Sequence, residues 1–142
     1  KEKSTVKFRK IILGYYALLF CGFALAALVI PDQIVGLMDS RLDSDVEKME
    51  FMATYGGLFM GIAIFLFYCL VNDVQAGLIA VLCTMGSMFV FRALGFFVFS
   101  TDNVVQFIYL IGEFVTVPIV CFLLIARKKR FNTHQERLQS SL

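Results

Sequence analysis

Two residues of opposite charge, Arg92 and Glu113, stand inside two otherwise apolar segments of the sequence. An ionisable side chain inside a membrane-spanning helix costs roughly 2.5–3.5 kcal/mol on insertion scales, so it indicates a function and a buried partner. From a rise of about 1.5 Å per residue, Arg92 lies about 12 Å and Glu113 about 15 Å from the polar connection 100–103. The side chains tilt toward a common depth, because their helices run in opposite directions. We therefore predict a facing Arg–Glu pair.

Polar side chains recur at helical spacing beside the acidic member of this pair. Gln106, Tyr109 and Thr116 occupy the same helix face as Glu113. They favour two interpretations equally. In the first, they supply the extra hydrogen bonds that a purely structural buried ion pair needs. In the second, they line a polar cavity in which Arg92 contacts an anionic or carbonyl group of a ligand and Glu113 orients Arg92.

Composition places these residues in a membrane protein. The chain has 142 residues, of which 59% are hydrophobic, whereas soluble domains typically contain about 45–50% apolar residues. A membrane-spanning helix takes about 20 mostly apolar residues, and four runs are long enough, at 11–30, 52–71, 76–99 and 104–126. We predict an all-α integral membrane four-helix bundle that forms a single domain over 1–142, with the first run kept as a helix rather than removed as a signal peptide.

The distribution of charge predicts the orientation of this bundle. Of 13 Lys and Arg residues, five lie in 1–10 and five in 127–137. Basic residues that flank membrane helices stay on the cytoplasmic side, so both termini are expected to be cytoplasmic. The connection 31–50 is acidic and is placed outside. Glu50, at its end, adds a third charge near the mouth of the cavity and predicts that the cavity opens outward.

Small residues predict where helices approach closely. Gly22 and Ala26 in the first run, and Gly57 and Gly61 in the second, have the spacing that allows close helix contact. Ser44 and Glu47 form a predicted capping box, which starts the second helix near Asp45. Tyr15 and Tyr16 are expected in an aromatic belt at the cytoplasmic interface.

The chain resembles a bacterial family of small four-helix membrane proteins named only as domain of unknown function 4345. The resemblance covers most of the chain and rests on residues that fit the family's pattern, which are Glu50, Tyr55, Gly56, Gly57, Arg92 and Glu113. It departs at Met52, where the family pattern has an Arg, and so leaves Arg92 as the only buried cation expected. The resemblance implies that Tyr55 belongs to the site and Gly56 to helix packing. A weaker likeness to DoxX-type four-helix proteins concerns the fold alone.

These observations favour a small non-enzymatic binding or accessory protein that holds a lipid headgroup or a small polar molecule. The candidate binding residues are Glu50, Tyr55, Arg92, Gln106, Tyr109, Glu113 and Thr116. Two alternatives are a proton-coupled small transporter that uses Glu113 and a structural subunit that binds other membrane subunits or a second copy through its glycine faces. An enzyme acting on a lipid ranks last, because no nucleophile, metal-ligand cluster or cofactor signature is present. We expect no cofactor, no metal and no nucleic-acid partner.

Overall fold

The computed structural model describes residues 2–99 and 103–139, and the side chains of residues 6–99 and 103–125. All the regular secondary structure of these residues is helical. Four helices are long and apolar enough to cross a membrane, which confirms the predicted spans. The elements are α1 (Glu2–Val29), α2 (Pro31–Leu37), α3 (Asp45–Phe51), the π-helical segment η1 (Met52–Gly57), α4 (Leu58–Asn72), α5 (Val74–Val98) and α6 (Val104–Gln139).

Side-chain caps set several of the helix boundaries. Proline is well tolerated in the first turn of a helix, and Pro31 opens α2 after α1 has ended at Val29. The predicted capping box is confirmed, since the Ser44 side chain accepts a bond from the backbone N–H of Glu47 and the Glu47 carboxylate accepts one from that of Ser44. The Asp73 side chain caps α5 by accepting from the backbone N–H groups of Gln75 and Ala76, and this helix begins two residues before the predicted start at 76.

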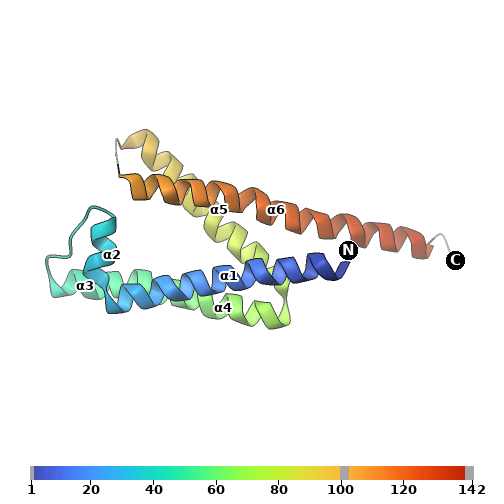
Figure 1. Ribbon diagram of the computed structural model, residues 1–142, viewed down its shortest axis with the longest axis horizontal. Helices are drawn as coiled ribbons and strands as arrows, with labels where there is room; N and C mark the ends of the chain where they lie inside the picture. The colour runs from blue at the N-terminus through green and yellow to red at the C-terminus, as the bar shows by residue number, and fades with distance from the viewer. Residues whose placement is uncertain (1, 100–102, 140–142) are drawn as a thin grey trace.

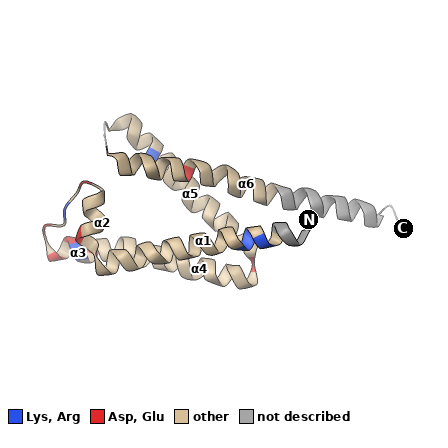
Figure 2. Ribbon diagram, in the orientation of Figure 1, with Lys and Arg blue, Asp and Glu red and all other residues tan. Residues whose placement is uncertain are grey.

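The long helices form two antiparallel pairs (Figure 1). The first pair is α1 with the continuous rod α3–η1–α4, and the second is α5 with α6. Helix α1 begins and α6 ends at the same end of the molecule, here called the terminal end, while α2 and α3 lie at the opposite end, the loop end. In Figure 2, charge gathers at the two ends, apart from one basic and one acidic position where α5 and α6 lie side by side. The fold therefore isolates the predicted pair in an apolar layer.

Alanines rather than the predicted glycine pairs bring α1 against the second helix of its pair. Buried residues recur along α1 every three or four positions, at Leu13, Ala17, Phe20, Ala24 and Ala27. An added Cβ at the buried Gly56 would lie 3.7 Å from the Ala24 carbonyl oxygen and 3.9 Å from the Ala27 Cβ. Transmembrane helices associate through such close packing of small residues. This stripe fixes how α1 lies on η1.

Three of the four glycines predicted for helix packing, Gly22, Gly57 and Gly61, face away from the helix contacts. An added Cβ at Gly22, Gly57 or Gly61 would meet no atom within 4 Å, and all three residues are exposed. They therefore make no close helix contact within the described chain, and Ala26 beside them is only half-buried. Because the stripe of alanines already fills the interface on α1, these glycines lie on its outer side and on the outer side of the second helix. Their use by a second protein stays a prediction.

The main core lies toward the terminal end and stops part of the way along the bundle. It joins all four long helices through 11 buried residues, which are Leu13, Ala17, Phe20, Ala63, Leu66, Cys69, Leu78, Val81, Met85, Val120 and Leu123. A second, smaller cluster of Ala27, Val35 and Phe51 ties α2 and α3 to the end of α1. Beyond the core, toward the loop end, the two helix pairs diverge (Figure 1). The candidate site occupies this region.

Gly77 lies where α5 crosses the first helix pair, and no larger residue fits there. An added Cβ would lie 2.6 Å from a methyl carbon of Leu13 and 2.8 Å from the Cβ of Cys69. The Cys69 Cβ is fixed to its backbone, so α4 and α5 would have to separate. At Gly86, farther along α5, an added Cβ would meet nothing within 4 Å.

We expect Gly77→Ala to lower the free energy of unfolding by about 1–3 kcal/mol, the usual cost of overpacking a filled core. Gly86→Ala is the matched control and should be neutral or stabilising by up to about 1 kcal/mol, because alanine has the higher helix propensity. Thermal unfolding of both variants in the same detergent measures the difference. Equal melting temperatures for the two variants would contradict the crossing described above.

Candidate functional site

Arg92 of α5 and Glu113 of α6 form the predicted ion pair. The Nη2 of Arg92 donates to Glu113 Oε1 at 3.0 Å, and its Nε lies 3.2 and 3.1 Å from Oε1 and Oε2. The Glu113 side chain is 6% exposed and that of Arg92 is 19% exposed. A side-on guanidinium–carboxylate contact of this kind is the strongest geometry for such a pair. It joins α5 to α6 at a depth where a lone charge would be costly.

Two further residues of α6 contact the same guanidinium. The Nη1 of Arg92 donates to the side-chain oxygen of Gln106, and the guanidinium carbon lies 5.2 Å from the centre of the Tyr109 ring. A cation over an aromatic face gains about 0.5–2 kcal/mol, more where it is shielded from water. The structure thus places Gln106, Tyr109 and Glu113 around Arg92, on the helix face that the sequence predicted.

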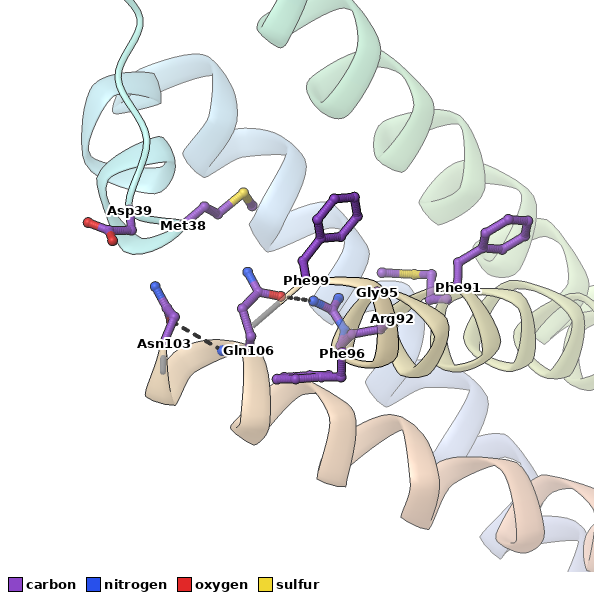
Figure 3. Close-up of a pocket in the computed structure, with 10 residues that line it drawn as sticks. Met38, Asp39, Phe91, Arg92, Gly95, Phe96, Phe99, Asn103 and Gln106 are labelled. Atoms are coloured by element: carbon purple, nitrogen blue, oxygen red, sulfur yellow. Dashed lines mark hydrogen bonds between the residues drawn. The ribbon is translucent and has the colours of Figure 1, made fainter. Parts of the chain in front are cut away.

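The start of α6 sets the position of these residues. The side chain of Asn103 accepts from the backbone N–H groups of Val105 at 2.9 Å and Gln106 at 3.3 Å, which caps the helix. Gln106 is therefore in the first turn of α6, and Tyr109 and Glu113 follow three and seven residues later on the same face. Figure 3 shows Arg92 and Gln106 joined between the two helices, next to the bond from Asn103.

Thr116, one turn beyond Glu113, links α6 to α1 instead of to the ion pair. Its hydroxyl donates to the Gly112 carbonyl at 2.7 Å and shares a hydrogen bond with the hydroxyl of Tyr16. The interfacial aromatic belt expected for Tyr15 and Tyr16 stays a prediction. The hydrogen bond between Tyr16 and Thr116 was not predictable from the sequence, because the two residues are on helices distant in sequence.

A central pocket of about 560 Å³ lies between the two helix pairs, directly beyond the core. Phe20 and Met85 belong both to the core and to the pocket wall. The wall is mostly aromatic or apolar, and its polar positions include Arg92 and Glu113. The residues that line it are Tyr15, Tyr16, Leu19, Phe20, Phe23, Met38, Tyr55, Phe59, Met85, Met88, Arg92, Gln106, Ile108, Tyr109, Gly112, Glu113 and Thr116. This volume is in the range of small-molecule sites, about 300–1,000 Å³.

A second pocket of about 600 Å³, the end pocket, lies at the loop end. Met38 and Asp39, which follow α2, lie across from Arg92 and Gln106 in Figure 3. Arg92, Gln106, Met38 and Met88 line both pockets, so the two adjoin at the guanidinium. The ion pair therefore stands at the junction of a largely apolar chamber and a more open one.

Of the two remaining predicted site residues, Tyr55 lines a pocket and Glu50 does not. Tyr55, carried on η1, lines the central pocket and its ring contacts those of Phe51 and Phe59. Glu50 is exposed and lines neither of these two pockets. A π-helix holds more residues per turn than an α-helix, and η1 directly follows the turn of Glu50. The α-helical geometry of α3, which carries Glu50, therefore does not continue unchanged toward the pocket.

The expectation of a single buried cation is also corrected. Arg9 is 8% exposed, in addition to the half-buried Arg92. The cause is the early start of α1, which places Arg9 four residues before Leu13 on the packing face of the helix. Arg9 lies at the terminal end, with the main core between it and the two pockets, so it is not part of the candidate site.

Removing one member of the ion pair leaves the other buried and uncompensated, which in proteins costs about 3–5 kcal/mol. We therefore expect Arg92→Met to destabilise the protein strongly and Arg92→Met/Glu113→Leu to recover most of the loss. Lys48→Met is the control, since Lys48 and Asp32 form an exposed pair at 3.0 Å, and exposed pairs contribute about 0–1 kcal/mol. Thermal unfolding in detergent reads out all three. A double variant less stable than Arg92→Met would contradict the pairing.

Comparison with known proteins gives a family. The comparisons with curated proteins and with solved structures found no match, so the expected likeness to DoxX-type proteins stays a prediction. The family model described as a domain of unknown function, DUF4345, matches residues 8–124. The matched range contains the four spans except for their outermost residues, both pockets, and the ion pair. The chain therefore belongs to the DUF4345 family of domains of unknown function.

Proposed function

We propose that this protein is a small non-enzymatic membrane protein that binds a small polar molecule or a lipid headgroup at the Arg92–Glu113 pair. Arg92 contacts the ligand, Glu113 holds the guanidinium in place, and the aromatic wall of the central pocket receives the apolar part of the ligand. Ligand sites are commonly apolar pockets with a few polar groups that fix orientation. The central pocket has this composition.

The observation that carries the proposal is the bonding of Arg92. A guanidinium has five N–H donors. Nε donates to Glu113, one N–H of Nη2 donates to Glu113, and one N–H of Nη1 donates to Gln106. One N–H on each terminal nitrogen is left over among these bonds, and Arg92 lines both pockets. A purely structural pair gains nothing from these donors, whereas a ligand acceptor would satisfy them.

The orientation in the membrane follows from charge. Basic residues concentrate in 1–10 and 127–137, and the positive-inside rule places such flanks in the cytoplasm. The terminal end then faces the cytoplasm of a bacterial inner membrane, and the loop end, with the end pocket, faces outward. The site opens on the outer half of the bilayer in this arrangement.

The two alternatives are less well supported. A proton-coupled transporter would need Glu113 to exchange protons, yet both of its carboxylate oxygens already accept hydrogen bonds from Arg92. A structural subunit would use the exposed Gly22, Gly57 and Gly61, which leave room for a second helix. This role is compatible with ligand binding and does not account for the ion pair.

Lipid and metabolite mass spectrometry of the purified protein tests the proposal. We expect a small molecule to co-purify with the wild type and to fall at least about tenfold in Arg92→Met/Glu113→Leu, the loss of about 1.4 kcal/mol of binding. The matched control, Lys48→Met/Asp32→Leu, removes the exposed ion pair outside both pockets and should retain it. Identical small-molecule content in all three proteins would refute ligand binding at the pair.

A further inference from the structure

We infer that the ligand is an uncharged amphiphile drawn from the bilayer, whose head carries a hydrogen-bond acceptor such as an ester or ketone carbonyl. This inference rests on the proposed function and names the chemical class that the site takes. The acceptor binds the two remaining N–H groups of Arg92, and the apolar body lies in the central pocket.

The charge of the site excludes an anionic head. Three residues that line the pockets carry charge, which are Arg92, Glu113 and Asp39. Glu113 neutralises Arg92 in the side-on pair, and Asp39 contributes a further negative charge at the end pocket. A phosphate or carboxylate placed beside Arg92 would therefore add a negative charge that no positive charge in the site balances. Like charges at close range in a medium of low dielectric repel strongly.

The hydrogen-bonding pattern requires an acceptor. Arg92 offers only donors, and it lines both pockets. A carbonyl oxygen accepts two hydrogen bonds without carrying charge. An apolar molecule would leave these donors unsatisfied, at a cost of about 1–3 kcal/mol each for buried groups.

The walls of the central pocket indicate where the apolar part of the ligand binds and how the ligand enters. Phe23 and Phe59 meet edge to face with ring centres 5.0 Å apart, and both line the pocket. On α1 and α6 the lining includes Leu19, which is 41% exposed, and Ile108, which is 60% exposed. These residues are within the membrane spans, so the pocket wall between α1 and α6 faces the acyl chains. A lipid-soluble molecule reaches the pocket from the side.

Fluorescence quenching tests the class directly, because the chain has no Trp. A Phe59→Trp variant, with Phe23→Trp as a second position, reports contact inside the pocket. Phe65→Trp is the matched control, since Phe65 is on the same helix, is 47% exposed and lines neither pocket. The probes are dibrominated methyl stearate, which is neutral, and dibrominated stearyl phosphate, which is anionic, each added to the protein in phosphatidylcholine nanodiscs.

We expect methyl dibromostearate to quench the pocket reporters at a concentration about tenfold lower than the phosphate does, and to lose this preference when Arg92→Met/Glu113→Leu is added. Phe65→Trp should show equal quenching by both probes. Tighter binding of the phosphate that depends on the pair would overturn the inference and leave the proposed function standing. Pocket quenching that is unaffected by the double variant, or no greater than at Phe65→Trp, would overturn both.

Discussion

The ion pair between Arg92 and Glu113 is the interaction on which the rest of the site depends. In hydrocarbon, neither charge is tolerated alone, so α5 and α6 must lie together at one register. The side-on bond fixes the guanidinium against α6, where Gln106 and Tyr109 complete its surroundings. The pair thereby does two things that are usually separate. It holds a helix hairpin together and fixes Arg92 in the wall of both pockets.

The space between the helix pairs exists because the main core extends only part of the way along the bundle from the terminal end. Alanines on α1 and Gly56 on η1 bring the first helix pair into close contact, and Gly77 lets α5 cross it near the terminal end. Beyond Phe20 and Met85, the second pair leans away from the first. Large aromatic side chains fill part of the gap and leave the central pocket. Tight packing at one end thus produces an open, aromatic-walled chamber at the other.

The sequence was sufficient for the spans, the capping box and the ion pair, because each depends on local periodicity, helix length or helix direction. The face of Gln106, Tyr109 and Glu113 was predictable for the same reason. Tyr16, Gly77 and Arg9 were not, since their roles arise from contacts between helices distant in sequence. Glu50 was placed at the pocket mouth from its position at the end of the acidic connection, but a π-helical segment follows it, and no residue pattern predicted that segment. Resemblance supplied Tyr55, which periodicity had passed over.

A crystal structure of the protein grown from a lipidic phase would show whether a ligand binds at the ion pair. We expect that Glu113 keeps its side-on bond to Arg92 and that a non-protein acceptor atom lies at hydrogen-bond distance, about 3 Å, from Nη1 or Nη2 of Arg92. Clear density in which both pockets hold neither ligand nor ordered water, and in which Arg92 contacts only protein atoms, would contradict this expectation. The pair would then serve only to hold α5 and α6 together.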